Sequence, residues 1–306
     1  MEKKSSKQPA AAAGFFIAFA GAILFSTKAV IVKKAFADVQ VDALTLLTIR
    51  MLFSLPFYLL AAFFIWRNNP GAKMTRKQWL ATIGLGLFGY YLSSLFDFMG
   101  LQYISAGLER LILFLYPSFA VLLNALLFRQ PIRRNEMLAL LLTYAGLGIA
   151  YYGELQLDTF NPNFFLGSFL VFLCSLTYAF YIVGSGRMVP KVGAGKFTTY
   201  SLLTSTAGVF THYALRGNYH ALEASIDLWW YGVLLALVAT VIPTFMLSAA
   251  LKKIGANRVA IISSIGPVST ILQAHYFLGE EIFALQIAGT LLVLAGVLLP
   301  VLKTKK

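Results

Sequence analysis

Hydrophobic residues gather along this chain into ten long runs, separated by short polar segments. Each run is close in length to the roughly 20 apolar residues that a helix needs to cross the hydrocarbon core of a bilayer. The runs are residues 14–32, 43–66, 79–99, 107–128, 135–152, 166–186, 196–215, 227–250, 257–278 and 283–302. The pattern predicts an all-α polytopic membrane protein with ten transmembrane helices, joined by connections too short for a separate soluble domain.

The composition supports this prediction. Of the 306 residues, 59% are hydrophobic and 12% are charged, whereas a soluble domain carries about 25% charged residues. So little charge excludes a soluble globular enzyme, a disordered chain and a fibre. The single cysteine, Cys174, lies in an apolar run. It forms no intrachain disulfide, and we expect it to be a small buried side chain.

The positive residues predict how the chain is oriented in the membrane. The formal net charge is +13, and 19 of the 25 Lys and Arg residues lie on the side of the predicted spans that also holds both termini. Because cytoplasmic loops are enriched in Lys and Arg, we expect cytoplasmic tails at 1–13 and 303–306. The net charge then reflects topology, and no nucleic-acid partner is expected. The expected location is the inner or plasma membrane of the cell.

The chain also contains an internal repeat, because its two halves align without a gap at an offset of 150 residues. The matching residues are Leu101 with Leu251, Ile104 with Ile254, Ala106 with Ala256, Pro117 with Pro267, and Ala145-Gly146 with Ala295-Gly296. Each half holds five predicted spans, so the second half enters the membrane from the opposite side. The sequence predicts a repeat at 14–152, an external linker at 153–165 and an inverted repeat at 166–302. Inverted repeats are typical of secondary transporters with a site near the midplane.

The last quarter of the chain carries a resemblance to a known family. The residues concerned are Ile254–Pro267, Leu278-Gly279-Glu280, Gln286–Gly289 and Leu294–Gly296. With the ten spans and the duplication, they resemble the drug/metabolite transporter superfamily, EamA type. Arg50 also lies where that family often has Arg, whereas Arg129-Gln130-Pro131 departs from the Gly-Glu pattern in the first half. The resemblance implies a transporter similar to bacterial exporters of amino acids and other metabolites.

Five ionisable residues of the first half are candidates for a polar site, because an isolated charge in hydrocarbon costs about 2.5–3.5 kcal/mol or more. They are Lys28, Arg50, Asp97, Glu109 and Arg110. As a functional site, Lys28 and Arg50 would bind a substrate carboxylate or phosphate. Asp97 would bind a substrate ammonium or carry a coupling proton, and Glu109 and Arg110 would serve coupling or gating. The alternative is structural, with Lys28 extending to the interface and Arg50 paired with Asp97.

The second half offers hydroxyl, amide and imidazole groups where the first half has charges. Ser263, Ser264 and Gln273 are candidate substrate contacts, and His275 is a candidate proton carrier. Tyr90 and Tyr116 are candidate lining residues of an aromatic cavity. Pro117 and Pro267 are expected to bend their helices in the middle and to act as hinges. Gly146, Gly148, Gly289 and Gly296 suit close packing of the fifth and tenth spans.

These features predict a secondary transporter, most simply an exporter of amino acids or related organic acids that works by alternating access. A sugar-phosphate or nucleotide-type anion exchanger is the alternative. A channel or a membrane enzyme fits less well, because the sequence has no His-Glu-x-x-His zinc motif and no Walker-type phosphate loop. We expect no cofactor, no metal ion and no catalytic residues. The expected partners are a small-molecule substrate and the lipid bilayer, and the chain would be a monomer or a homodimer.

Overall fold

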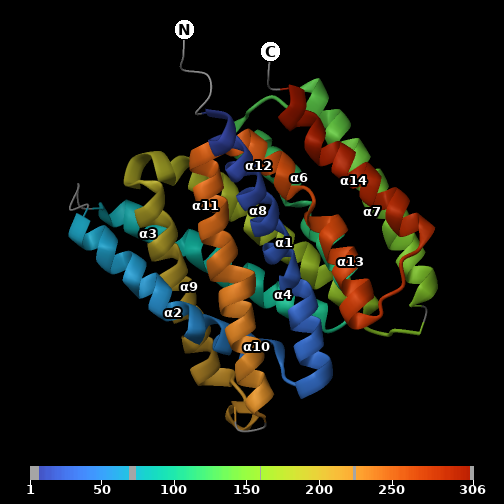
Figure 1. Ribbon diagram of the computed structural model, residues 1–306, viewed down its shortest axis with the longest axis horizontal. Helices are drawn as coiled ribbons and strands as arrows, with labels where there is room; N and C mark the ends of the chain where they lie inside the picture. Colours follow the sequence, from blue (N-terminus) through green and yellow to red (C-terminus); the bar gives the residue numbers. More distant parts are fainter. Residues whose placement is uncertain (1–6, 69–73, 159, 223–224, 304–306) are drawn as a thin grey trace.

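The computed structural model describes residues 7–68, 74–158, 160–222 and 225–303, and every regular element in these ranges is helical (Figure 1). The elements of the first half are α1 (Lys7–Val39), α2 (Ala43–Asn68), α3 (Arg76–Gly86), the π-helix η1 (Leu87–Leu92), α4 (Ser93–Leu101), α5 (Ala106–Leu113), α6 (Tyr116–Phe128) and α7 (Arg134–Leu157). Those of the second half are α8 (Phe164–Val192), α9 (Ala194–Arg216), the short 3₁₀ helix η2 (Tyr219–Leu222), α10 (Ile226–Ala236), the π-helix η3 (Leu237–Val241), α11 (Ile242–Ile254), α12 (Ala256–Ser263), α13 (Gly266–Leu278) and α14 (Ala284–Lys303).

The prediction of an all-α membrane protein is confirmed. Seven helical segments within the described ranges are long and apolar enough to cross a membrane. These segments correspond to α1, α2, α3–η1–α4, α5–α6, α7, α8 and α10–η3–α11. The other three predicted runs coincide with α9, α12–α13 and α14, which do not meet that criterion. For α9, the Ser and Thr residues lower the hydropathy. Since three of the ten runs do not meet the criterion, ten crossings stay a prediction.

The element boundaries recur at the interval of 150 residues found in the sequence. Both halves contain a π-helix, at 87–92 and at 237–241. In both halves a later helical segment is interrupted by two residues, between α5 and α6 in the first half and between α12 and α13 in the second. The next helix ends in each half with a residue in the left-handed region, Arg129 (φ +53°) and Gly279 (φ +72°). The two halves are therefore built from the same series of elements.

The two prolines of the repeat lie at these interruptions rather than inside continuous helices. Pro117 is the second residue of α6, and Pro267 is the second residue of α13. A proline is tolerated in the first helical turn because its missing N–H would have no partner there. Each proline thus follows a two-residue interruption of its helix, at 114–115 and 264–265, and its action as a hinge stays a prediction.

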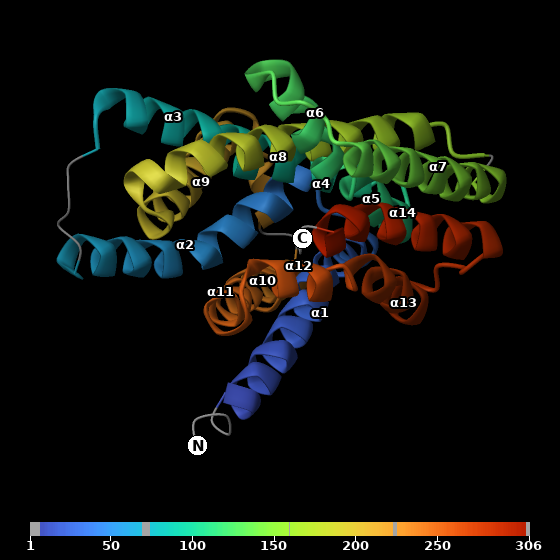
Figure 2. The same ribbon diagram turned by 90° about the horizontal axis from the view of Figure 1, so that it is seen from above.

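Seen from above, α7 and α14 lie on one side of the molecule and α2 and α3 on the other, with α4 and α8 between them (Figure 2). α1 begins and α14 ends at the same end of the molecule, the top in Figure 1. Large apolar side chains lie exposed on the outer helices, among them Leu60, Phe63, Trp66, Leu126 and Leu141. Such an extensive exposed apolar surface is typical of contact with lipid rather than with water.

α7 and α14 pack closely along their length, and glycines make this possible (Figure 1). A Cβ added at Gly289 would lie 2.4 Å from the backbone oxygen of Gly146, and one at Gly146 would lie 2.6 Å from that of Gly289. A Cβ at Gly296 would lie 2.4 Å from Oγ1 of Thr143, whereas one at Gly148 would have no neighbour within 4 Å. The expected glycine packing is therefore present at three of the four positions, and Gly148 takes no part in it.

Replacing Gly289 with Ala is expected to destabilise the protein, because overpacking against a rigid backbone costs about 1–3 kcal/mol. Gly148→Ala adds the same methyl group to the same helix pair, at a place where space is open. Thermal unfolding of the two purified variants in one detergent measures the difference. Gly289→Ala should lower the melting temperature by several degrees and Gly148→Ala should leave it unchanged. Equal melting temperatures would contradict the close packing.

Candidate functional site

Four of the candidate charges meet in one buried cluster formed by α1, α4 and α5. The ammonium of Lys28 lies 2.5 Å from Oδ2 of Asp97 and 3.8 Å from Oε1 of Glu109. Nε of Arg110 lies 3.9 Å from Oε2 of Glu109. Asp97, Glu109 and Arg110 are each at most 3% exposed. We call these four residues the charge cluster. Its two positive and two negative charges balance, which is the condition for keeping ionised groups away from water.

The charge cluster reaches the second half of the chain through Arg110. Its Nε donates to Oγ1 of Thr270 on α13 (3.1 Å), and its Nη2 donates to the backbone oxygen of Ser26 on α1 (3.3 Å). Thr270 is fully buried and donates to the same oxygen of Ser26 at 3.2 Å. Charges from one half and a hydroxyl from the other are therefore joined in one polar network.

The carboxylates of the charge cluster have spare capacity to accept hydrogen bonds. All four oxygens of Asp97 and Glu109 are buried, and none accepts a hydrogen bond by geometry, although Lys28 is close to both groups. A buried carboxylate has lost its hydration, so Asp97 and Glu109 depend on the nearby cations Lys28 and Arg110. The ammonium of Lys28 is therefore the cationic group that lies close to both carboxylates.

Arg50 lies beside the charge cluster but does not pair with Asp97. Its Nη2 donates to Oγ of Ser94 at 3.0 Å, and its guanidinium carbon lies 5.0 Å from the centre of the Phe98 ring. Ser94 and Phe98 are one turn of α4 or less from Asp97. The structure therefore assigns the ion pair with Asp97 to Lys28. Arg50 is 7% exposed, and its Nε has no hydrogen-bond partner.

The two helix interruptions lie next to each other and to the charge cluster. A Cβ added at Gly266, the first residue of α13, would lie 3.3 Å from Oγ of Ser26 and 3.7 Å from the Phe114 ring at the end of α5. Interrupted helices leave backbone groups without helical partners, and membrane proteins tolerate this only inside the protein or at a polar cavity. Both halves thus bring their irregular backbone close to the charge cluster, whose charged residues all come from the first half.

A row of tyrosines lies between α6, α8 and η1. The ring centres of Tyr116 and Tyr178 are 5.1 Å apart, those of Tyr178 and Tyr181 5.9 Å, and those of Tyr181 and Tyr90 4.8 Å. The hydroxyls of Tyr90 and Tyr181 are hydrogen-bonded at 3.0 Å. Tyr116 begins α6, directly after the interruption that follows α5. The structure therefore brings Tyr90 and Tyr116 into one aromatic group.

The candidate residues of the second half are less closely joined to the charge cluster. Ser264 donates to the backbone oxygen of Ile261 at 2.6 Å, and Gln273 donates to Ser269 at 2.8 Å, so both bond within their own helices. Ser263 is partly buried at the end of α12. His275 lies exposed in the last turn of α13, with Nδ1 2.8 Å from the backbone oxygen of Glu280. His275 therefore lies apart from the charge cluster.

The sequence did not point to Ser26 and Ser94, and Thr270 stood out only as one of several polar residues in the predicted span 257–278, without its partner Arg110. Each is a small polar residue inside an apolar helix, and many such residues only bond back to their own helix, as Ser26 also does through Oγ to Ala22. Thr270 lies 160 residues after Arg110, so their contact is visible only in the folded chain. The sequence offered one signal for these contacts: a buried arginine has five N–H donors, so it needs several acceptors nearby.

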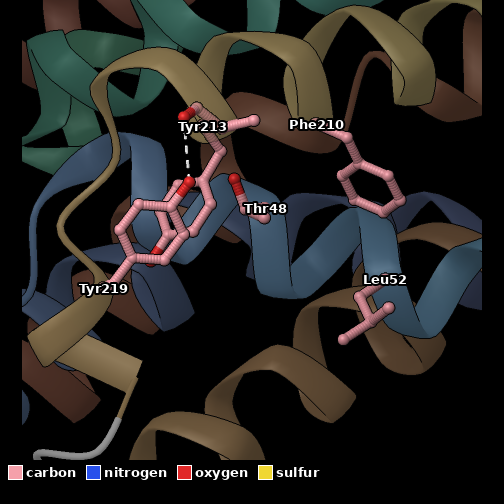
Figure 3. Close-up of a pocket in the computed structure, with 6 residues that line it drawn as sticks. Thr48, Leu52, Phe210, Tyr213 and Tyr219 are labelled. Carbon is pink, nitrogen blue, oxygen red and sulfur yellow. Dashed lines mark hydrogen bonds between the residues drawn. The ribbon is translucent and has the colours of Figure 1, made fainter.

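A separate groove lies between α2 and α9, away from the charge cluster (Figure 3). It has a volume of about 270 Å³ and is lined by Thr48, Leu52, Phe210, Tyr213, Ala214 and Tyr219. Tyr219 donates to the backbone oxygen of Ala214 at 2.9 Å (Figure 3). The lining is almost wholly apolar and the groove is open, so its chemistry differs from that of the charge cluster. Within the described ranges, no group of three or more His, Cys, Asp or Glu side chains is placed to hold a metal ion.

The fold is that of a multi-pass helical membrane protein, and comparison with known proteins gives its family. The profile of the EamA-like transporter family matches residues 12–152 and again residues 165–302. The chain belongs to this family, which is part of the drug/metabolite transporter superfamily. This confirms the family that was predicted from the resemblance of the sequence.

Individual relatives agree with this assignment. The chain is 32% identical to the uncharacterized transporter YcbK of Bacillus subtilis, over 99% of this chain and 98% of that protein. It is 25% identical to an uncharacterized transporter of Archaeoglobus fulgidus, over 71% of this chain and 74% of that protein. A solved structure described only as a crystal structure of a protein has the same fold, with a TM-score of 0.63 at 19% identity, covering 94% of this chain and 98% of that one.

Proposed function

We propose that this transporter is a secondary carrier that exports small polar metabolites, such as amino acids or related organic acids, by alternating access. The observation that carries the proposal is the charge cluster and its link to Thr270, because it joins the two halves through buried groups that have free acceptor capacity. Buried ionisable residues in membrane helices are by default candidates for substrate or ion pathways. Moving the halves relative to each other would change which side of the membrane reaches them.

The proposed topology has ten crossings, five in each half, with both ends of the chain in the cytoplasm of a cell whose inner or plasma membrane holds the protein. The repeat of element boundaries at 150 residues supports two copies of one unit. An odd number of crossings in each copy makes the second copy inverted, with the substrate site between them. The domains would then be the repeats at 14–152 and 166–302, the external linker at 153–165 and two short tails.

An amino acid suits the proposed site because it carries one group for each side of the cluster. Its ammonium would bind Asp97, and its carboxylate would bind Lys28 or Arg50. Ser263, Ser264 and Gln273 would contact the rest of the molecule, and Tyr90 and Tyr116 would line its path. A sugar-phosphate or nucleotide anion exchanger is the second candidate, favoured by the nearby unpaired Nε of Arg50. A channel or an enzyme has less support.

The same site offers a route for coupling to a proton. Asp97 and Glu109 share the ammonium of Lys28, so one proton on either carboxyl group would replace part of the charge that Lys28 provides. Arg110 would act as a gate, because its bond to Thr270 joins the two halves. His275 is a weaker candidate for this role because of its exposed position. Pro117 and Pro267 would act as hinges beside the helix interruptions.

A screen of single compounds tests the substrate class. Purified protein is melted with acidic, basic and neutral amino acids, with glucose 6-phosphate and with uridine monophosphate, and each stabilising compound is then used in proteoliposomes. We expect an amino acid or organic acid to raise the melting temperature and to show saturable uptake that is faster into vesicles preloaded with the same compound. Stabilisation and exchange by the phosphate compounds alone would replace the proposal with the anion exchanger.

A further inference from the structure

The end of α13 makes a contact with the start of α5 that the charge cluster does not include. Glu280, in the turn after α13, accepts from the backbone N–H of Ala106 through Oε1 at 2.9 Å and from that of Gly107 through Oε2 at 3.3 Å. Its own backbone is fixed to α13, because its N–H donates to Ala274 and its oxygen lies 2.8 Å from Nδ1 of His275. The carboxylate of Glu280 therefore moves with α13 while it binds α5.

This contact completes the hydrogen bonding at the start of α5. The first four N–H groups of a helix have no helical partner of their own. Glu280 binds those of Ala106 and Gly107, and the side chain of Ser105 binds that of Leu108. A carboxylate is also favoured here by the partial positive charge of a helix N-terminus. Separating α13 from α5 would leave the N–H groups of Ala106 and Gly107 without these partners.

Lys33 of α1 strengthens the same contact. Its ammonium donates to the backbone oxygen of Ile104 at 2.6 Å and lies 4.0 Å from Oε1 of Glu280. We call Lys33 and Glu280 the latch. α5 also carries Glu109 and Arg110 on its next turn, so the latch sets the position of the helix that supplies half of the charge cluster.

The other half of the chain has the same turn without the charge. Gln130 lies 150 residues before Glu280 and follows Arg129, which has the same left-handed conformation as Gly279. The side chain of Gln130 is exposed. Under the proposed topology, Gln130 lies at the cytoplasmic end and Glu280 at the external end. Gln130 and Glu280 therefore differ by one negative charge, and the residues on either side differ as well, with Arg129 and Pro131 at the positions equivalent to Gly279 and Glu281.

We infer that Glu280 and Lys33 are positioning residues for transport: they hold the external end closed, and the neutral Gln130 makes the cytoplasmic closure weaker, so that the resting protein is open to the cytoplasm. The inference rests on the proposed alternating access. A resting state open to the cytoplasm suits an exporter, because the site then meets its substrate inside the cell. Glu280 touches no substrate in this account and acts through the position of α5.

Cysteine labelling from outside tests the latch without a substrate. Cys174 is the only cysteine, so Cys174→Ala gives a background without thiols. Ala274→Cys then places a reporter on α13 at a position that is 1% exposed. A membrane-impermeant maleimide is applied to right-side-out vesicles. Glu280→Gln should raise the labelling rate at least tenfold, the effect expected from weakening hydrogen bonds to a charged group.

Three comparisons make the result specific. Glu281→Gln removes the same charge from the adjacent exposed residue and should leave the rate unchanged. Gln130→Glu leaves the latch intact but should strengthen the cytoplasmic closure, so it should also raise labelling from outside. A reporter at Ala179→Cys, buried in α8, should stay unlabelled in every variant, because labelling there would indicate general loosening.

Equal rates for Glu280→Gln and Glu281→Gln would overturn the latch, as would labelling at Ala179→Cys that rises together with that at Ala274→Cys. If Glu280→Gln does not fold, an unchanged rate for Gln130→Glu overturns the asymmetry of the two ends. Uptake stimulated by preloaded substrate, measured in parallel on the unmodified protein, separates the two proposals. Stimulated uptake without an effect of Glu280→Gln on labelling would support the carrier and contradict the latch. An effect of Glu280→Gln on labelling without stimulated uptake would support the contact between α13 and α5 and contradict the carrier.

Discussion

Replacing Lys28 with Met is expected to abolish transport and to lower stability by about 3–5 kcal/mol, the range for removing one partner of a buried ion pair. The ammonium is 2.5 Å from Asp97 and 3.8 Å from Glu109, so its loss leaves two buried carboxylates with Arg110 as the remaining nearby cation of the cluster. Thermal unfolding measures the stability and proteoliposome uptake measures the transport.

A second substitution separates the two effects of Lys28→Met. Adding Asp97→Asn removes the unpaired charge, so the double variant should melt at a higher temperature than Lys28→Met alone. Transport should stay absent, because both charged groups of the proposed site are gone. Lys34→Met is the matched control, since Lys34 is an exposed neighbour whose partner is Asp38 on its own helix. Recovery of transport together with stability would show that the ion pair is only structural.

Replacing Glu109 with Gln is expected to remove the response to a proton gradient while leaving exchange of substrate for substrate. The side chain stays nearly the same in size, but it can no longer exchange a proton with the shared site next to Lys28 and Asp97. A fluorescent pH indicator inside the vesicles reports proton movement when substrate is added. Glu109→Gln should give no pH change and should retain at least half of the exchange rate.

The control for this prediction is a carboxylate that lies elsewhere. Glu136 is in the exposed first turn of α7, where it accepts from the backbone N–H of Arg133 at 2.8 Å. Glu136→Gln should keep both proton movement and exchange. Proton movement that persists unchanged in Glu109→Gln would remove Glu109 from the coupling mechanism. Loss of both activities would assign it to substrate binding instead.

Much of the fold could be predicted from the sequence, because hydrophobic length and loop charge are local signals. The ten apolar runs all coincide with helices, and the offset of 150 residues anticipated the repeat of elements down to the left-handed turns at Arg129 and Gly279. The glycines at 146, 289 and 296 could be assigned to helix packing for the same reason. The helix breaks could not be placed, because a proline only indicates that something interrupts or begins there.

The site could be predicted in its charges but not in its pairing. Buried ionisable residues stand out in apolar helices, so Lys28, Asp97, Glu109 and Arg110 were visible in the sequence. Which of Lys28 and Arg50 pairs with Asp97 depends on how α1, α2 and α4 cross, and sequence spacing does not contain that information. The contact of Glu280 with α5 joins residues more than 170 positions apart, so it too required the folded chain.

The most direct test of the central claim is counterflow of a labelled substrate in proteoliposomes, comparing the unmodified protein, Lys28→Met and Lys34→Met. The account predicts that preloading with unlabelled substrate accelerates uptake in the unmodified protein and in Lys34→Met, and that Lys28→Met shows no acceleration. Equal acceleration in Lys28→Met would contradict a transport site at the charge cluster. Uptake in the unmodified protein that neither saturates nor responds to preloading would contradict alternating access.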